Sequence, residues 1–290
     1  MRINRQTNLV RNPKLSVSLV LYKSNPQQVN KVISNICDID LDTKLYIINN
    51  SPTHHYDIIS DERITYYTSS KNLGFGSSHN KTIRDTADIS DYHLIINPDV
   101  YFNEGTIEQI ITYIEANRDI GVIMPRILYP DGSCQYLAKL LPSPFDFLIR
   151  RFMPVASIQR RLNKKFELRA IEDSMVLDVP FLSGCCLIFR TEVLKKVGGF
   201  DENIFMYTED IDICRRVILA GYRSVFYPKV HVFHDHIRKS FKDISVFWTY
   251  LNSGIYYFRK WGWFFDRQRY RLNSQTIRQL KESLQNSRLK

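Results

Sequence analysis

Four short apolar runs, separated by amphipathic or polar stretches, divide the first hundred residues of the chain. By length and content they are typical of buried strands, and they cover residues 15–22, 45–48, 64–68 and 94–96. Asn25-Pro26 follows the first run and marks the start of a helix that we expect to end near Cys37. Strands that alternate with helices at this spacing predict βαβ units, and therefore an α/β fold built on a mostly parallel sheet.

A second ordered stretch lies beyond the middle of the chain and combines a helix with a strand. Thr208 can cap this helix, acidic residues fill its first turn, and Gly221 stands where a left-handed residue would end it. Apolar residues recur at three- and four-residue spacing, which predicts one buried face made of Ile211, Cys214 and Ile218. We expect a strand over residues 222–227, then Pro228, then a short apolar run that ends at His234.

Polar clusters follow the predicted strands, at residues 22–24, 49–51, 69–80 and 97–99. Ligands of open α/β sheets bind beyond the carboxyl ends of the strands, so these clusters indicate a binding site.

The segment 71–80 (KNLGFGSSHN) places two glycines and two serines before a predicted helix. A plain loop with a helix cap explains that composition. The glycine spacing is not G-x-G-x-x-G, which argues against a nicotinamide dinucleotide. A helix start with free N–H groups still suits a phosphate or a sugar hydroxyl.

The motif Asn97-Pro98-Asp99 also has two interpretations. Pro98 can end a buried strand, which leaves Asp99 as an exposed turn residue. Alternatively Asp99 is a ligand for a divalent cation, because hard cations prefer carboxylate oxygens and a diphosphate group needs such an ion.

The acidic helix start and the histidines near residue 234 are ambiguous by themselves. Carboxylates in a first helical turn complement the helix dipole by about 0.3–1 kcal/mol each, which explains them without chemistry. The three histidines fall within six residues, at His231, His234 and His236. That spacing also permits a ligand site.

Composition limits the class of protein. The 290 residues are 44% hydrophobic and 24% charged, as in ordinary globular proteins. Five cysteines without a C-x-x-C pair argue against a disulfide framework or a zinc site, and for a reducing compartment. The polar N-terminus lacks the apolar core of a signal peptide, and no run of 18 apolar residues occurs. We therefore expect a cytoplasmic protein.

The net charge of +10 is concentrated in two segments. Residues 238–290 hold twelve Lys and Arg against three Asp and Glu, and residues 145–169 hold seven against two. Aromatic residues interleave with the basic ones, which suits either helices packed on the domain or an interfacial surface on anionic lipid. The same interleaving and the pI of 9.3 admit nucleic-acid binding, although no reader motif is present.

Several motifs resemble those of the family 2 inverting glycosyltransferases, and most closely the bacterial rhamnosyltransferase-like branch. The resemblance covers roughly residues 15–130 and 175–260. The segments that carry it are Asn72-Leu73-Gly74-Phe75, Asn97-Pro98-Asp99, Phe200-Asp201-Glu202, Tyr207-Thr208-Glu209-Asp210-Ile211-Asp212, Ala220-Gly221-Tyr222 and Val232-Phe233-His234. It implies a GT-A type nucleotide-sugar-binding fold, with a mostly parallel mixed sheet, flanking helices and a C-terminal helical extension.

The resemblance also implies roles in a site. Asp210 matches the family's general base, and His234 matches the imidazole beside the donor diphosphate and its metal. Asn97 replaces the first carboxylate of the family's Asp-x-Asp, which leaves Asp99 as the main carboxylate ligand. The expected cofactor is a divalent metal, Mn²⁺ or Mg²⁺, and Mn²⁺ tolerates an imidazole ligand better.

Donor and acceptor would bind on different sides of this site. Asn49 stands where many relatives place Asp to contact the nucleobase, and an amide both donates and accepts, so the base stays open. The donor side would include Tyr22, Asn49, Asn72, Gly74, Asn97 and Asp99. The acceptor side would include Ser183, Gly184 and Glu209.

We expect residues 1–237 to form the catalytic domain, with residues 145–172 as a basic insertion, and residues 238–290 to form the extension. The expected reaction moves a sugar, rhamnose-like by preference, from a nucleotide-diphosphate donor to a hydroxyl of a surface polysaccharide or lipid-linked oligosaccharide. Such a protein would be cytoplasmic or peripheral on the inner face of the membrane, with an anionic membrane surface as a further partner and no nucleic acid. The alternative is a peripheral membrane or nucleic-acid-binding protein with a catalytically inactive transferase fold.

Overall fold

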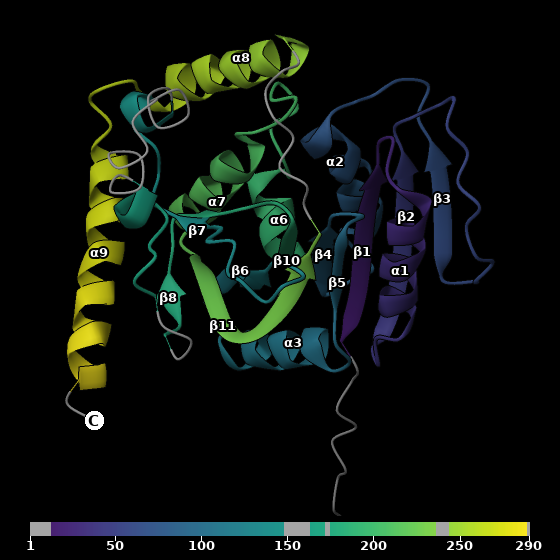
Figure 1. Ribbon diagram of the computed structural model, residues 1–290, viewed down its shortest axis with the longest axis horizontal. Coiled ribbons are helices and arrows are strands. Elements are labelled where there is room, and N and C mark those ends of the chain that lie inside the picture. The colour runs from purple at the N-terminus through teal and green to yellow at the C-terminus, as the bar shows by residue number, and fades with distance from the viewer. Residues whose placement is uncertain (1–12, 148–162, 172–174, 236–243, 289–290) are drawn as a thin grey trace, which may run out of the picture.

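A computed structural model describes residues 13–147, 163–171, 175–235 and 244–288. Nine strands among these residues form one sheet in the order β3-β2-β1-β4-β10-β6-β11-β5, with β8 beside β11 (Figure 1). The strands are β1 (Lys14–Leu21), β2 (Asp42–Asn49), β3 (Ile64–Thr68), β4 (Tyr92–Ile96), β5 (Val100–Phe102), β6 (Ile120–Leu128), β8 (Leu177–Asp178), β10 (Cys186–Arg190) and β11 (Arg223–His234). Two further strands, β7 (Ala138–Lys139) and β9 (Phe181–Leu182), pair separately.

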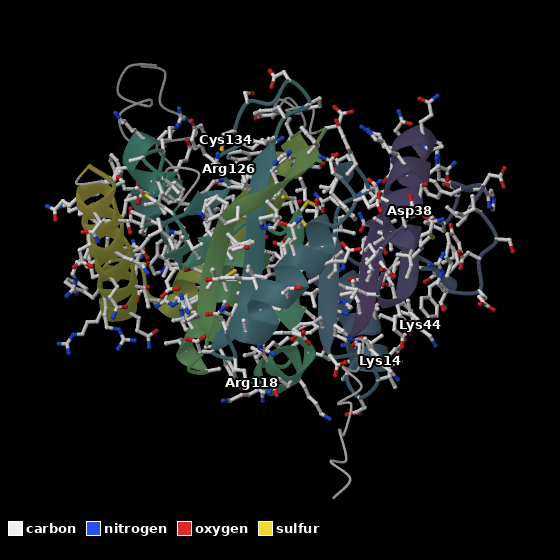
Figure 2. All side chains as sticks on the ribbon, turned by 90° about the horizontal axis from the view of Figure 1, so that it is seen from below. Lys14, Asp38, Lys44, Arg118, Arg126 and Cys134 are labelled. Carbon is white, nitrogen blue, oxygen red and sulfur yellow. The ribbon has the colours of Figure 1, made fainter. Side chains whose placement is uncertain are left out.

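The four apolar runs at the start of the chain are β1 to β4, which are mutually parallel. β10 lies antiparallel between β4 and β6, so the sheet is mixed, as expected. Lys14 and Lys44 lie near the amino ends of β1 and β2, on the side seen from below in Figure 2. The carboxyl ends of these strands therefore point to the opposite side of the molecule.

Helices cover both faces of the sheet. They are α1 (Pro26–Cys37), α2 (Phe75–Thr86), α3 (Thr106–Ala116), α6 (Thr191–Val197) and α7 (Glu209–Leu219). α2, α6 and α7 form one layer, and α1 and α3 form the layer on the other face. The predicted start of α1 is confirmed, because the Asn25 side chain accepts a hydrogen bond from the Gln27 N–H and Pro26 is the first helical residue.

Two local predictions differ from the structure. β11 is one strand from Arg223 to His234, whereas the sequence suggested a break at Pro228. Its register on β6 shifts between Tyr227 and His231, so Pro228, which lacks an N–H, lies in an irregularity of the strand. Thr208 precedes α7 but makes no side-chain cap. Its hydroxyl donates instead to the Ser253 carbonyl oxygen at 3.2 Å.

The C-terminal extension consists of α8 (Ile244–Trp261) and α9 (Arg267–Arg288), and both helices pack on the body of the protein. Arg215 of α7 makes two hydrogen bonds of 2.6 Å to Asp266, and both side chains are almost fully buried. Asp212 of α7 accepts a hydrogen bond of 2.8 Å from the Trp261 indole. Helices packed on the domain, one of the two arrangements that the sequence allowed, are therefore present, and α8 lies above α7 in Figure 1.

The outer side of the extension exposes large apolar residues. Phe265 is 98% exposed and Phe264 is 69% exposed in the turn between α8 and α9. Within the described residues, no helix combines the length and apolar content needed to cross a bilayer. Much of the predicted basic insertion, residues 148–162 and 172–174, lies outside the described residues, as does His236.

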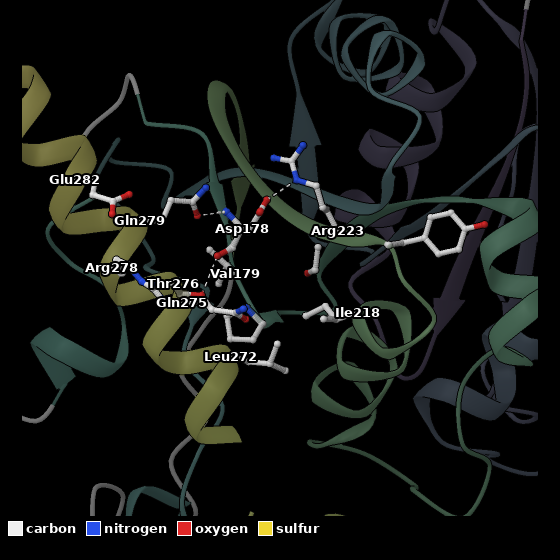
Figure 3. Close-up of a pocket in the computed structure, with 13 residues that line it drawn as sticks. Asp178, Val179, Ile218, Arg223, Leu272, Gln275, Thr276, Arg278, Gln279 and Glu282 are labelled. Atoms are coloured by element: carbon white, nitrogen blue, oxygen red, sulfur yellow. Dashed lines mark hydrogen bonds and ion pairs between the residues drawn. The ribbon is translucent and has the colours of Figure 1, made fainter. Parts of the chain in front are cut away.

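α9 borders two cavities. One, of about 510 Å³, lies between α9 and the strands β8 and β11 (Figure 3). There the Asp178 carboxylate accepts from Arg223 at 2.9 Å, and the Asp178 N–H donates to Gln279 of α9 at 2.9 Å. The second cavity lies on another side of the helix and is described below.

Candidate active site

Asp99 and His234 face each other at the carboxyl end of the sheet. β4 ends at Ile96, and the turn Asn97-Pro98-Asp99 leads into β5, which pairs antiparallel with the end of β11. That pairing brings the Asp99 Oδ1 to 3.3 Å from the His234 Nε2. The Asp235 N–H also donates to the Asp99 carbonyl oxygen at 2.8 Å, which fixes the turn. The structure thus brings together the two side chains that the sequence assigned to a metal.

Gln135 orients the His234 ring and was missed in the sequence. Its amide nitrogen donates to the His234 carbonyl oxygen at 2.6 Å, so its amide oxygen is left facing the His234 Nδ1 at 2.9 Å. Nδ1 therefore carries a proton, and Nε2 is the atom directed at Asp99. No local pattern marks Gln135, because its partner is 99 positions away.

The electrostatics of His234 follow from these contacts. Burial alone would lower the pKa of His234, but its interactions with Asp99 and Cys185 outweigh burial and raise that pKa to about 10. In the described part of the chain, no three His, Cys, Asp or Glu side chains gather closely enough to hold a metal ion by themselves.

Asp210 is a buried carboxylate at the start of α7. Its Oδ2 accepts the Gly184 N–H at 3.1 Å, and its Oδ1 accepts the Ile211 N–H at 2.8 Å. Burial raises the pKa of Asp210 to about 6, although these two N–H groups and the positive charge of Lys139 oppose the shift. A carboxylate with this pKa is ionised near neutral pH and still basic enough to accept a proton.

The two acidic neighbours of Asp210 have different environments. Asp212 is fully buried, bound by Arg216 at 2.7 Å and by Lys260 at 2.8 Å, and so serves to hold α8 and α7 together. Glu209 is 5% exposed, and its Oε2 has no hydrogen-bond partner. Burial and the nearby Asp210 charge raise the pKa of Glu209 well above its ordinary value, which favours the protonated form of this carboxyl.

The segment Ser183–Cys185 connects the two halves of the site. The Cys185 carbonyl oxygen accepts the Asn97 N–H at 2.9 Å, on the side of the Asp99–His234 pair. The preceding residue, Gly184, donates its N–H to Asp210, and the Ser183 N–H donates to the Leu137 carbonyl oxygen at 3.2 Å. Asn97, His234 and Asp210 thus surround three consecutive residues at the entry to β10.

The residues assigned to the donor lie at neighbouring strand ends, but several are already engaged. Tyr22, after β1, is 47% exposed. Asn49, at the end of β2, is 2% exposed; its amide oxygen accepts the Ser51 N–H and its nitrogen donates to the His54 carbonyl oxygen. The Asn49 amide is thus held by its own loop. Its contact with a nucleobase stays a prediction.

Asn72 and Gly74 belong to a second, tightly built turn. The Asn72 amide oxygen accepts the Gly74 N–H at 3.0 Å, and Gly74 has a φ of 83°. A Cβ at Gly74 would lie 2.4 Å from the Phe205 carbonyl oxygen, so only glycine fits there. Asn50, which the sequence did not single out, donates to Ser78 at 2.7 Å and holds this turn against β2.

A buried histidine pair behind the site also went unrecognised. The Ser18 hydroxyl of β1 lies 2.6 Å from the His79 Nδ1 and 2.9 Å from the His93 Nε2. Both rings are fully buried. Burial lowers the pKa of His93 to about 3 and the pKa of His79 well below its ordinary value, so both rings are neutral.

The sequence of the chain is similar to those of several known proteins. Residues 13–245 match the model of a family described as glycosyltransferase like family 2. The chain is 29% identical over 204 residues to an N-acetylglucosaminyl-diphospho-decaprenol L-rhamnosyltransferase of Mycobacterium tuberculosis, a match that covers 66% of each protein, just under two thirds. It is 24% identical over 261 residues to rhamnosyltransferase WbbL of Escherichia coli K12, covering 83% of this chain and 92% of that one.

Solved structures with the same fold include two transferases. One is the mannosyltransferase PcManGT from Pyrobaculum calidifontis in complex with GDP-Man and Mn²⁺, with a TM-score of 0.52 and 14% identity over 80% of this chain and 59% of that one. The other is GalNAc-T7 with UDP, GalNAc and Mn²⁺, with a TM-score of 0.54 and 12% identity over 77% of this chain and 44% of that one. At these identities the likeness concerns the fold alone, and it confirms the expected GT-A architecture.

Proposed function

The chain belongs to glycosyltransferase family 2, and on that premise we propose that it moves a sugar from a nucleotide-diphosphate donor to an acceptor hydroxyl with inversion at the anomeric carbon. Rhamnose is the favoured sugar, because two relatives are named rhamnosyltransferases. The acceptor is a surface polysaccharide or a lipid-linked oligosaccharide. The observation that carries the proposal is the buried carboxylate of Asp210 beside the segment that also touches Asn97.

Asp210 acts as the general base. It takes the proton from the acceptor hydroxyl while that oxygen attacks the anomeric carbon from the face opposite the nucleotide. The Gly184 and Ile211 N–H groups hold the carboxylate in one orientation, so no side-chain search precedes the proton transfer. No covalent glycosyl-enzyme forms, because a single displacement inverts the configuration.

Glu209, Ser183 and Gly184 form the acceptor side. In its protonated form, which burial favours, the Glu209 carboxyl can donate one hydrogen bond to a sugar hydroxyl, whereas the ionised Asp210 next to it can only accept one. Gly184 leaves room for the sugar and Phe75 to approach, since an added Cβ there would lie 3.1 Å from the Phe75 ring. The two carboxyl groups thus take different roles because their protonation differs.

Asp99 and His234 fit a divalent cation. One carboxylate oxygen and one imidazole nitrogen converge, and Gln135 fixes the tautomer that presents Nε2. This mixed oxygen and nitrogen set suits Mn²⁺ better than Mg²⁺. When bound, such an ion neutralises negative charge on the departing diphosphate. Because the chain would supply only these two ligands, we expect weak binding of the metal without the donor.

The inner face of the membrane is a further partner. Phe264 and Phe265 are exposed in the turn after α8, and the segment 238–290 carries an excess of basic residues. Aromatic side chains suit the headgroup level of a bilayer, and each Lys or Arg near an anionic surface contributes about 1 kcal/mol.

A thermal-shift screen of the full chain against dTDP, UDP and GDP, each with and without Mn²⁺, tests the proposal. We expect one nucleotide diphosphate to raise the melting temperature, and to do so more strongly with Mn²⁺. Asp99→Asn is the matched variant and should lose the Mn²⁺-dependent part of the shift. No shift with any nucleotide would contradict a donor site, and an unchanged Mn²⁺ response in Asp99→Asn would contradict the metal ligand.

A further inference from the structure

A long apolar groove lies between α9 and two other segments of the chain, residues 140–146 and 164–170. Its volume is about 760 Å³, which is in the range of small-molecule sites. The apolar side chains that line it are Leu140, Leu141, Phe166, Leu168, Ile277 and Leu280. These residues serve neither the donor nor the metal side of the site described above.

The walls of this groove are fixed by hydrogen bonds. The Asn273 side chain of α9 accepts the Leu141 N–H at 2.8 Å and donates to the Leu141 carbonyl oxygen at 3.0 Å. The Leu140 N–H donates to the Phe166 carbonyl oxygen at 3.0 Å. One asparagine and one backbone contact thus join the three wall segments, so the groove is a built feature of the fold.

The groove is elongated along α9. On α9 it follows one face of the helix through Tyr270, Asn273, Ile277, Leu280 and Leu284. These positions recur at three- and four-residue spacing, and at 1.5 Å per residue they span about 21 Å. An elongated apolar molecule fits such a stripe better than a compact one does.

The rim of the groove is cationic. Lys164, Lys165 and Lys281 line it and are exposed. The carboxylate of Asp146, which also lines it, accepts hydrogen bonds from the Ser143 N–H at 2.9 Å and hydroxyl at 2.6 Å. An apolar floor with a basic rim complements a ligand that joins a hydrocarbon chain to a phosphate.

The wall segment that begins at Leu140 leads to the catalytic base. β7 pairs with β9, which places Lys139 opposite Phe181, two residues before Ser183. Gly184 follows and donates to Asp210. The residue after Lys139 is Leu140, the first wall residue of the groove. A molecule with a hydroxyl at Asp210 and a tail in the groove would therefore pass Lys139.

The α8–α9 end of the groove adjoins the exposed aromatic turn. Arg269 and Tyr270 line the groove, and Tyr270 is 63% exposed. They follow Phe264 and Phe265, the most exposed apolar residues of that turn, by a few positions.

We propose that this groove binds the hydrocarbon chain of a lipid-phosphate-linked acceptor, with the phosphate held by Lys139 and the rim lysines Lys164 and Lys165. The proposal rests on the proposed function, because it names the part of the acceptor that lies outside the reacting sugar. It assigns acceptor selection to α9 and residues 139–141 rather than to the donor side.

Binding of farnesyl phosphate by the full chain tests the groove without catalysis. Ile277→Trp places an indole inside the groove, and Gln285→Trp places one on the exposed surface of the same helix as its matched control. We expect wild type and Gln285→Trp to bind farnesyl phosphate, and Ile277→Trp to bind it at least tenfold more weakly. Farnesol and inorganic phosphate should each bind much more weakly than farnesyl phosphate.

A second variant guards against misfolding of Ile277→Trp. Lys164→Glu/Lys165→Glu changes only exposed side chains and should weaken farnesyl phosphate tenfold or more while leaving farnesol unchanged. Absence of farnesyl phosphate binding in wild type overturns the proposal. So does equal affinity of Ile277→Trp and Gln285→Trp, or equal binding of inorganic phosphate, which would show an anion site without a role for the chain.

An assay of sugar transfer distinguishes a failure of the groove proposal from a failure of the proposed function. With a polyprenyl-diphosphate acceptor, Ile277→Trp should raise KM at least tenfold; with the same sugar on a short, water-soluble aglycone, KM and kcat should match wild type. Binding of farnesyl phosphate without transfer to any acceptor would refute the proposed function and leave the groove standing. Transfer to both acceptors with equal KM in wild type would refute the groove and leave the function standing.

Discussion

The backbone N–H of Gly184 donates to Oδ2 of Asp210 at 3.1 Å, across 26 positions of sequence. The adjacent residue, Cys185, accepts the Asn97 N–H through its carbonyl oxygen. Two adjacent residues, Gly184 and Cys185, thus connect the candidate base to the turn that carries the candidate metal ligand Asp99. Because a rigid strand entry supports both, the acid–base and metal halves of the site keep a fixed separation.

Asp210→Asn should lower kcat by about 10²–10⁴-fold, because general-base catalysis contributes about that factor. The variant should also be more stable at pH 7.5: burial raises the pKa of Asp210 from 3.8 to about 6, and removal of that buried charge relieves up to roughly 3 kcal/mol. Transfer assays and urea denaturation check both effects. Turnover within tenfold of wild type, or a lower stability, would argue against a buried base.

The acid side of the pH–rate profile should follow Asp210. The base must be ionised, so kcat/KM should fall about tenfold per pH unit below pH 6. Lys139 lowers the pKa of Asp210, so Lys139→Met should move this limb to higher pH. The profile is measured with a water-soluble acceptor. A limb that does not move in Lys139→Met would show that another group controls it.

Gln135→Leu should lower the affinity for the metal although it replaces neither of the candidate metal ligands. Loss of the partner of His234 Nδ1 frees the ring to rotate and to change tautomer, which typically costs 10–100-fold in metal affinity. The readout is the Mn²⁺ concentration for half-maximal activity. Gln28→Leu is the control, since Gln28 contacts the neighbouring Asp235 through an exposed side chain at 2.9 Å. An equal change of the half-maximal Mn²⁺ concentration in both variants would show that Gln135 does not support the metal site.

The buried histidines should make the fold sensitive to mild acid. The pKa values of His79 and His93 are lowered in the folded protein. Above pH 6.5 the two rings are neutral in both the folded and the unfolded protein, whereas just below pH 6.5 they gain protons only in the unfolded protein. Stability should fall as pH drops, by about 1.4 kcal/mol per pH unit for each histidine. Urea midpoints at pH 7.5 and 5.5 should differ less in His79→Gln/His93→Gln than in wild type or in the exposed-site control His55→Gln. An identical pH response would contradict neutral burial.

The extension should depend on the buried pair of Arg215 and Asp266. Arg215→Met removes both 2.6 Å hydrogen bonds to the buried Asp266 carboxylate, which keeps only the Arg269 N–H at 3.0 Å and the Arg269 guanidinium at 4.0 Å, and should destabilise the protein by up to about 3–5 kcal/mol. The double variant Arg215→Met/Asp266→Met removes both charges and should recover most of that loss. Thermal melts of the three proteins decide the matter. A double variant as unstable as the single one would mean that packing, rather than charge, holds α9 in place.

Local signals in the sequence were enough for the strands and for several turns. β1 to β4 follow apolar runs, α1 begins at Asn25-Pro26, and Gly221 has the left-handed φ of 94° that the end of α7 requires. Each of these depends on neighbours within a few positions. Asp99, His234 and Asp210 became candidates through motif resemblance, and their roles remain proposals.

Contacts between distant residues could not be predicted in this way. Gln135 is hydrogen-bonded to His234, and Ser18 is hydrogen-bonded to both His79 and His93. Thr208 donates to Ser253 instead of capping α7. The partners in each of these hydrogen bonds are at least 45 positions apart. The irregularity that lets β11 continue through Pro228 likewise depends on its partner β6. These features arise from the packing of elements, which residue patterns along one chain do not encode.

The anomeric configuration of the product tests the central claim most directly. The enzyme is incubated with Mn²⁺, an acceptor and the donor selected by the nucleotide screen, and the new glycosidic bond is assigned by NMR. We expect the configuration opposite to that of the donor, with product from wild type and almost none from Asp210→Asn. Retention of configuration, or a comparable yield from Asp210→Asn, would contradict a single displacement with Asp210 as its base.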